Sequence, residues 1–232
     1  MICPHAGYSF SGPTAGRAYR ELRSRPPQVV IVLAPSHQDR FRGATAWPGA
    51  GYRTPLGDLP SPLWLVELLE REEAGIHQDR LGHREEHSAE VQLPFLQEIA
   101  PHAEVLSLVL AEDHPESCFK IGRAIARTTA GRGILLVASS DLCHGHSNRL
   151  CEETDTRTLA ALERNDPEEL VAGFRNGRFQ ACGRGPILAV LEACRHVGAE
   201  CVRVLEHTNS DRVTGETGDY VVGYAAVSIS RA

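Results

Sequence analysis

The sequence predicts an α/β fold, in which a mostly parallel central sheet is flanked by helices on both faces. Two observations lead to this prediction. Short apolar runs of strand length recur along the 232 residues, and stretches with the apolar spacing of amphipathic helices lie between them. Because strands that alternate with helices form parallel βαβ units, the alternation indicates this class.

Five apolar runs rich in Val, Leu and Ile are expected to form strands because of their composition and their short length. In chain order, the expected strands are residues 29–33, 105–110, 134–138, 201–205 and 221–229. Apolar residues at helical spacing predict helices between and around these strands. The expected helices are residues 13–24, 61–73, 88–99, 115–128, 148–165, 167–176 and 185–197.

No repeat, low-complexity tract or linker interrupts this pattern, and no shift in composition marks a boundary. A chain of this length with 42% hydrophobic residues can bury a large core. We therefore expect residues 1–232 to form a single domain. Pro4, Gly7, Gly12 and Pro13 crowd the first residues, so this stretch is expected to be a loop that leads into a helix.

The charge and hydropathy of the chain exclude some classes of partner. With a net charge of -6 and a pI near 6.0, the sequence offers no broad basic surface to phosphates, so nucleic acid is not an expected partner. No apolar run approaches the roughly 20 residues that cross a bilayer, and the first residues lack the pattern of a secretory signal. We expect a cytoplasmic protein with no membrane contact.

The cysteines do not suggest disulfides. Seven cysteines occur without a close CxxC pair, which argues against a disulfide framework or a zinc finger and favours free thiols in a reducing compartment. Most are expected to be small buried apolar residues, and Cys143 has no expected role. Lys120 is the one lysine among many arginines, which indicates a GC-rich and therefore bacterial genome.

Polar, reactive clusters follow most of the predicted strands. The loops after three of these strands carry His37, Asp141, His144 and Asp211. In an open parallel sheet such loops share one edge, where ligands bind, so these side chains are expected to face a common region. Polar residues also cap helices in such loops, and capping is the preferred interpretation for Asp113, His114 and Asp211.

Three candidate metal donors come from separate segments, namely His5, His37 and Cys182. Two imidazoles and one thiolate, with an open position for water or substrate, suit iron, copper or zinc. The alternative for His5 is an incidental surface imidazole at a frayed terminus. A purely structural zinc site is disfavoured because the donors are few and lie in loops at the expected crevice.

Cys182 is the most informative of these donors. Gly183, Gly185 and Pro186 place it where a helix begins. Backbone N–H groups and the helix dipole at that end are expected to favour the thiolate over the thiol. The alternative is a buried thiol that only packs.

Three further residues are candidates for acid–base or orienting roles. His87 stands at the start of the predicted helix 88–99, with Ser88 as the expected N-cap, and it either moves protons or itself caps the helix. Asp141 and His144 are three positions apart, so we expect the carboxylate to orient the imidazole. The remaining histidines have no expected role or are expected to lie in solvent: His77, His83, His102, His146, His196 and His207.

Seven stretches follow one another along the chain: PHAGYSFSGPTAG, VLAPSHQD, YRTPLGDL, EEHSAEVQLPFLQ, SSDLCHGH, ACGRGPI and VGYAAVSI. Together they resemble the Memo family, whose bacterial and archaeal members are often called AmmeMemoRadiSam system protein B. The resemblance runs from His5 to nearly the last residue. It implies a fold similar to that of the class III extradiol ring-cleaving dioxygenases, which hold non-haem Fe(II) in an α/β domain.

The resemblance makes His5, His37 and Cys182 the metal site. Around it the resemblance places His87, Asp141 and His144. Fe(II) is the first expectation for the metal, Cu the second and Zn the third. A thiolate stands where the dioxygenases have a carboxylate, which softens the site, favours copper as well as iron and argues against ring cleavage. Family members usually carry a segment before the first strand, so we expect that segment to be short or missing here.

Two functions are consistent with these residues. The leading hypothesis is a metal-dependent, dioxygenase-like oxidoreductase, in which the three donors hold Fe(II) or Cu and His87 or His144 moves protons. The alternative is a non-catalytic module whose crevice binds a peptide or a partner within a protein-modification system. A small molecule or a peptide is the expected ligand in the crevice, and the family name implies a radical SAM protein as a partner.

Overall fold

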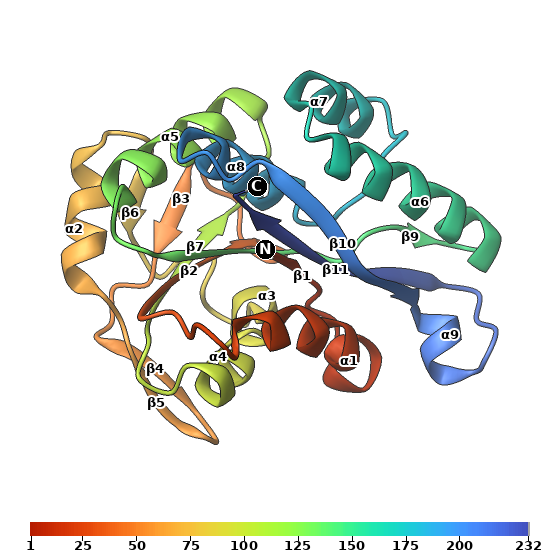
Figure 1. Cartoon of the computed structure of the whole chain (residues 1–232), viewed down its shortest axis with the longest axis horizontal. Coiled ribbons are helices and arrows are strands. Elements are labelled where there is room, and N and C mark those ends of the chain that lie inside the picture. Colours follow the sequence, from red (N-terminus) through yellow and green to blue (C-terminus); the bar gives the residue numbers. More distant parts are fainter. Residues whose placement is uncertain (232) are drawn as a thin grey trace.

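The computed structural model describes residues 1–231 and contains a central sheet with helices on both of its faces (Figure 1). The strands are β1 (Ile2–Cys3), β2 (Val29–Pro35), β3 (Ala44–Ala46), β4 (Gly51–Thr54), β5 (Gly57–Pro60), β6 (Ile76–Gln78), β7 (Glu104–Leu110), β8 (Leu135–Ser139), β9 (His144–Gly145), β10 (Cys201–Asn209) and β11 (Val221–Ser230). The helices are α1 (Tyr8–Tyr19), α2 (Leu63–Arg71), α3 (His87–Glu90), α4 (Leu93–Ile99), α5 (Pro115–Thr129), α6 (Asn148–Arg164), α7 (Pro167–Arg175), α8 (Arg184–His196) and α9 (Ser210–Thr214), with a 3-10 turn at Arg20–Leu22.

The central sheet has the strand order β10-β11-β1-β8-β2-β7-β3-β6, and β9 pairs with β11 outside this path. Strands β1, β8, β2 and β7 run parallel to one another. β11 pairs antiparallel with β1 and β10, and β3 pairs antiparallel with β7. The expected α/β class with a mostly parallel sheet is therefore confirmed, and antiparallel strands extend the sheet on both sides.

Successive residues of the central strands are buried on opposite faces of the sheet. In β2, Ile31 and Leu33 belong to the core that α2, α5 and α8 cover, whereas Val30 and Val32 belong to the core beneath α1 and α4 (Figure 1). All four side chains are fully buried. A strand buried on both faces needs an apolar residue at nearly every position, which explains why the sequence shows continuous apolar runs here.

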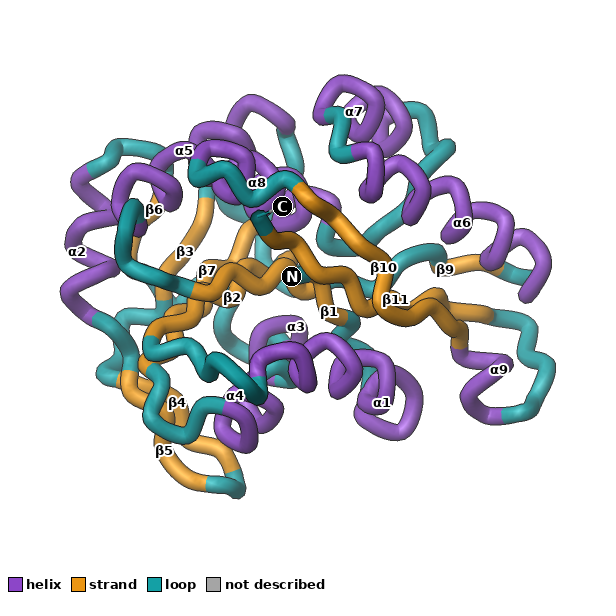
Figure 2. Tube along the Cα trace, in the orientation of Figure 1, coloured by secondary structure: helices purple, strands orange, loops and turns teal. Residues whose placement is uncertain are grey.

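All five expected strands are present, with slightly different ends. The structure adds six strands of four residues or fewer: β1, β3, β4, β5, β6 and β9 (Figure 2). These strands are too short to show either an apolar run or a clear alternation. The two-residue strand β1 nevertheless lies inside the sheet, between β8 and β11.

Two predicted helices differ in their boundaries. The helix expected from residue 13 begins at Tyr8, so Gly12 and Pro13 lie inside it, where packing of the buried Ser11 and Thr14 overrides weak helix propensity. The helix expected over residues 88–99 divides into α3 and α4. Pro94 stands in the first turn of α4, where a missing N–H removes no helical hydrogen bond.

Among the described residues, no helix combines the length and the apolar composition that a membrane span requires.

Helices α5 and α8 approach each other closely at Gly122. A Cβ atom placed on Gly122 would lie 2.5 Å from Ala189 O and 2.9 Å from Glu192 Cβ. We expect Gly122→Ala to force these helices apart and to lower the free energy of unfolding by about 1–3 kcal/mol. Urea unfolding followed by circular dichroism measures this change.

Gly16→Ala in α1 is the matched control, because a Cβ there would lie 3.8 Å from Phe95 Cε1, an ordinary contact. The control is expected to leave stability unchanged or to raise it slightly, since alanine is the better helix former. Equal destabilisation by both substitutions would contradict the close packing of α5 on α8.

Candidate metal centre

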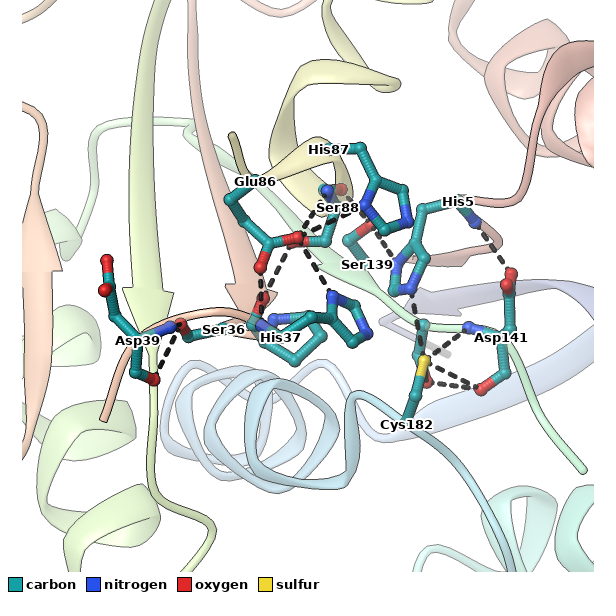
Figure 3. A network of polar contacts seen from close by, with 12 residues as sticks. His5, Ser36, His37, Asp39, Glu86, His87, Ser88, Ser139, Asp141 and Cys182 are labelled. Atoms are coloured by element: carbon teal, nitrogen blue, oxygen red, sulfur yellow. Dashed lines mark hydrogen bonds and ion pairs between the residues drawn. The ribbon is translucent and has the colours of Figure 1, made fainter. Parts of the chain in front are cut away.

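Segments that are distant in sequence bring three donor side chains together at one edge of the sheet (Figure 3). His5 follows β1, His37 follows β2, and Cys182 precedes α8. One ligand atom from each lies within 4.8 Å of the others, and His5 Nε2 is 3.2 Å from Cys182 Sγ. The structure thus gathers the three residues that the sequence analysis selected as metal donors into one group that could hold a metal ion.

Ser139 holds the His5 ring in one tautomer. The Ser139 hydroxyl donates its single proton to Ser88 O at 2.6 Å and accepts from Gln92 Nε2 at 2.8 Å. The contact between His5 Nδ1 and Ser139 Oγ, at 2.9 Å, must therefore be an N–H donated by the imidazole. His5 Nε2 is then the unprotonated nitrogen, and this nitrogen faces Cys182.

The surroundings of His5 also keep the ring neutral. The Tyr19 hydroxyl donates to Gln92 Oε1 at 2.9 Å, which fixes the amide that bonds to Ser139. Burial, and then the neighbouring His37, lowers the pKa of His5 to about 3. A neutral imidazole with a free nitrogen is the form that binds metals. Because His5 is 2% exposed, the alternative of a surface imidazole at a frayed terminus is wrong.

Glu86 orients the second imidazole. Its carboxylate accepts the backbone N–H of His37 and, at 2.9 Å, the Nδ1 N–H of the same ring. The hydrogen bond to Glu86 raises the pKa of His37. Burial alone would raise the pKa of Glu86, but the hydrogen bonds from His37 and from the Ser88 N–H lower it to about 2. The ring thus presents its Nε2 away from Glu86.

Cys182 lies just outside the first turn of α8. Gly183 is the N-cap, so the cysteine precedes the helix. Burial, assisted by the charge of Asp141, raises the pKa of Cys182 to about 12. In the protein without a bound cation, this raised pKa runs against the expected thiolate at the start of the helix, because desolvation of the sulfur opposes the helix dipole. A metal ion beside the sulfur would reverse this preference.

The predicted pairing of Asp141 with His144 is also wrong. Asp141 Oδ1 accepts the backbone N–H of His5 at 2.8 Å, and burial raises the pKa of this carboxyl to about 6. His144 Nδ1 lies 2.9 Å from the Tyr220 hydroxyl instead. A spacing of three brings side chains together on a helix, but here β9 begins at His144 and pairs with β11. Asp141 positions the His5 backbone, and Tyr220 orients His144.

His87 lies beside the donors without being one of the three. Its ring centroid is 5.6 Å from that of His5 and 5.1 Å from that of His37 (Figure 3). The side chain is 54% exposed, so it faces the solvent side of the group. Glu86 caps α3 by accepting the Ser88 N–H at 3.0 Å, so both the expected Ser88 cap and the alternative of a capping histidine are wrong.

Three expectations away from this centre are also corrected. Asp211 lies in the first turn of α9, and Asn209 rather than Asp211 caps that helix. His83 is not solvated, because its Nε2 contacts a backbone carbonyl at 3.1 Å. His207 Nε2 lies 3.0 Å from the buried carboxylate of Asp155. The histidines exposed as expected are His77, His102, His146 and His196.

A cavity opens beside the donor group. It has a volume of about 270 Å³ and is lined by His144, Cys182, Phe174, Phe179 and Arg184 among others. Phe174 and Arg184 also line an adjoining cavity of about 640 Å³. A ligand in this cavity would therefore meet the Cys182 sulfur, the rings of Phe174 and Phe179, and the guanidinium of Arg184.

Four residues that orient this site were not found from the sequence: Gln92, Ser139, Glu86 and Tyr220. Glu86 has only a weak local signal, since it directly precedes a predicted helix but glutamate is not among the usual N-cap residues. Gln92 and Ser139 occupy positions that look like ordinary helix and strand-end residues. Tyr220 is 76 positions from His144, and nothing local connects the two.

Comparisons with known proteins agree with the motifs. A family model described as Memo-like protein matches residues 1–228. A MEMO1 family protein of Aeropyrum pernix is 37% identical over 232 residues and covers 98% of this chain and 82% of its own length. A MEMO1 family protein of Nitrosopumilus maritimus is 32% identical over 228 residues, with coverage of 98% and 82%.

Among solved structures, an uncharacterised protein from Escherichia coli K12 is similar with a TM-score of 0.61 at 18% identity. The similarity covers 90% of this chain and 91% of the other, and at this identity it concerns the fold alone. Fold and site define an α/β protein with a histidine–cysteine group that could hold a metal. The chain belongs to the Memo-like family, so the resemblance seen in the sequence is confirmed.

The Glu86–His37 pair predicts a pH-dependent contribution to stability in the metal-free protein. The pKa of Glu86 is lowered from 4.5 to about 2, so its contribution is full above pH 4.5 and is lost as the pH falls toward 2. The pKa of His37 is raised from 6.5, so its contribution is full below pH 6.5 and is lost as the pH rises above that. Glu86→Gln should therefore destabilise most between pH 4.5 and 6.5, by about 1–3 kcal/mol.

Urea unfolding at pH 5.5 and at pH 3 measures this difference. Glu98→Gln is the matched control, because Glu98 lies on the exposed side of α4. The control is expected to change stability little at either pH. A Glu86→Gln effect that is as large at pH 3 as at pH 5.5 would show that the charge of Glu86 does not stabilise His37.

Proposed function

We propose that this protein is a metal-dependent redox protein in which His5, His37 and Cys182 hold Fe(II) or Cu. The observation that carries the proposal is the convergence of these three ligand atoms within 4.8 Å beside an open cavity. Three protein donors with one side open are the arrangement of a catalytic site, whereas a structural site is usually closed by a fourth donor.

The donors present fit such a metal. His5 and His37 each direct one ring nitrogen away from a fixed hydrogen bond on the other, as metal-binding histidines do. Two imidazoles and a sulfur suit iron, copper and zinc, and the sulfur makes copper competitive with iron. When bound, the metal would supply redox and Lewis-acid chemistry. All seven cysteines are free, which supports a reducing, cytoplasmic location.

Two histidines outside the donor set are suited to proton transfer. His87 is half-exposed beside both imidazole donors. His144 lines the cavity next to Cys182, and burial lowers its pKa, which keeps it able to accept a proton at neutral pH. The two rings would act on a ligand from different sides, with Tyr220 holding the orientation of His144.

A non-catalytic binding module is the second candidate, and the shape of the cavities favours it. The space beside Cys182 and the adjoining space near His114 share Phe174 and Arg184 as lining residues. Such a pair of spaces suits an extended ligand, for example a peptide, as well as a small molecule. A radical SAM protein as partner remains an expectation from the family name.

Metal content tests the site. Protein loaded with Fe(II) without oxygen should bind about one iron per chain, and His5→Ala or Cys182→Ser should remove most of it, because two donors make an incomplete shell. Cys201→Ser is the control, since Cys201 begins β10 and belongs to none of the metal-compatible groups. Full iron content in both donor variants, with unchanged circular dichroism, would mean that the assigned donors are wrong.

Oxygen consumption separates the two candidate functions. If the protein is an oxidoreductase, the Fe(II) form should consume O2 with an electron-rich aromatic such as a catechol faster than free iron does. His87→Gln or His144→Gln should slow O2 consumption by about 10²–10⁴-fold. His102→Gln, at an exposed histidine, should leave the rate unchanged. An oxygen electrode gives the rates, and mass spectrometry identifies the products.

If the protein is a binding module, O2 uptake should be slow and should not change with these substitutions. The main product should then be oxidised Cys182. Little ring opening is expected in either case, because the carboxylate donor of the extradiol dioxygenases is replaced by sulfur. Rapid formation of a ring-opened product would contradict that expectation.

A further inference from the structure

A second group of metal-binding side chains lies apart from the candidate centre. It consists of Cys143, Cys151 and Asp155, all buried, with one ligand atom from each within 4.8 Å of the others. His207 reaches the same place, with Nε2 3.0 Å from Asp155 Oδ2. We refer to these four residues as the Cys/Asp cluster. The proposed redox function uses none of them.

Local structure brings the cluster together from three elements. Cys151 and Asp155 are four positions apart on α6 and therefore lie on one face of the helix. Cys143 comes from the segment before β9 and donates its backbone N–H to Asp155 Oδ1 at 2.9 Å. His207 stands on β10. Two donors at i and i+4 on a helix with further donors from nearby strands are a common way to surround a metal ion.

The backbone makes room for the carboxylate. Gly223 on β11 lies against Asp155, and a Cβ atom there would be 1.8 Å from Asp155 Oδ2. Gly223 also donates its N–H to Cys143 O at 2.9 Å, so β11 holds the Cys143 segment and the carboxylate side by side. Only glycine leaves the space in which the cluster forms.

The distances are close to those of a tetrahedral zinc shell. Zn–S bonds of about 2.3 Å and Zn–N or Zn–O bonds of about 2.0 Å place neighbouring ligand atoms roughly 3.3–3.8 Å apart. Cys151 Sγ is 3.8 Å from Asp155 Oδ2, and His207 Nε2 is 3.0 Å from the same oxygen. Cys143, Cys151 and Asp155 already form one metal-compatible group, and His207 would have to turn toward the two sulfurs to complete a shell of two sulfurs, one oxygen and one nitrogen.

The buried carboxylate of Asp155 also suits a bound cation. Its side chain is 0% exposed, and within residues 1–231 its one ion-pair partner is His207. The two adjacent thiols bring no positive charge. The carboxylate is already paired with His207 and accepts the Cys143 N–H, and a divalent ion among these donors would add a full positive charge beside it.

We propose that Cys143, Cys151, Asp155 and His207 form a structural zinc site. Zn²⁺ would take both sulfurs as thiolates, with their two protons released to solvent, one oxygen of Asp155 and Nε2 of His207. Zinc is the favoured ion because it is borderline soft, accepts sulfur and oxygen together and needs no open position in a structural site. The bound ion would fasten the segment that carries His144 to α6 and β10.

Zinc stoichiometry in a variant that lacks the first donor group tests the proposal. His5→Ala/Cys182→Ser, or Cys182→Ser alone if the double variant does not fold, should still bind one Zn²⁺ per chain. With Co²⁺ as the probe, it should give the intense near-ultraviolet band of cobalt–thiolate bonds. Adding Cys151→Ser should weaken Zn²⁺ binding at least roughly 100-fold, because an alcohol does not replace a thiolate on zinc. Adding Cys201→Ser instead should leave the affinity for Zn²⁺ unchanged.

Two further measurements do not depend on Cys151→Ser folding. Zn²⁺ should raise the unfolding temperature of the first-group variant, and His207→Gln should reduce both that rise and the affinity. A folded first-group variant that binds no Zn²⁺, or one that keeps it after loss of Cys143 and Cys151, overturns the proposal and leaves a hydrogen-bonded thiol cluster. Substitution of His5 or Cys182 should remove iron, whereas substitution of Cys143 or Cys151 should remove zinc. The two metal proposals can therefore fail independently of each other.

Discussion

The hydroxyl of Ser139 connects the parts from which the candidate centre is built. Ser139 is the last residue of β8 and pairs with Cys3 of β1. Its side chain therefore lies beside the segment after β1, which carries His5. All of its hydrogen-bonding capacity is used, toward His5, Ser88 and Gln92. A buried hydroxyl with three partners leaves little choice of geometry, and the tautomer of His5 follows from that constraint.

Solvent exposure increases across the site from the sheet outward. His5 is buried beside the sheet, His37 is partly exposed and held by Glu86, and His87 is mostly exposed. Fixed donors need supporting hydrogen bonds, because a metal shell tolerates little displacement. A group that moves protons to and from a ligand needs access, which the exposed position of His87 provides. Under the proposed function, this gradient would separate the residues that position the metal from the one that transfers protons.

One short segment contributes to both of the proposed metal sites. Asp141 holds the backbone of His5, His144 faces the cavity, and Cys143 between them points to α6. Because β9 and β11 pair here, neighbouring residues are directed to opposite sides. The segment therefore links the edge of the sheet to α6.

By itself, the sequence determined the α/β class, the five long strands and the Memo-like family, because continuous apolar runs and ordered motifs are local signals. It also selected His5, His37 and Cys182. Only the tertiary structure decided which carboxylate holds which histidine, since Glu86 rather than Asp141 orients an imidazole. Side-chain partners are set by strand pairing between segments far apart in the chain, and the sequence near each residue carries no record of that pairing.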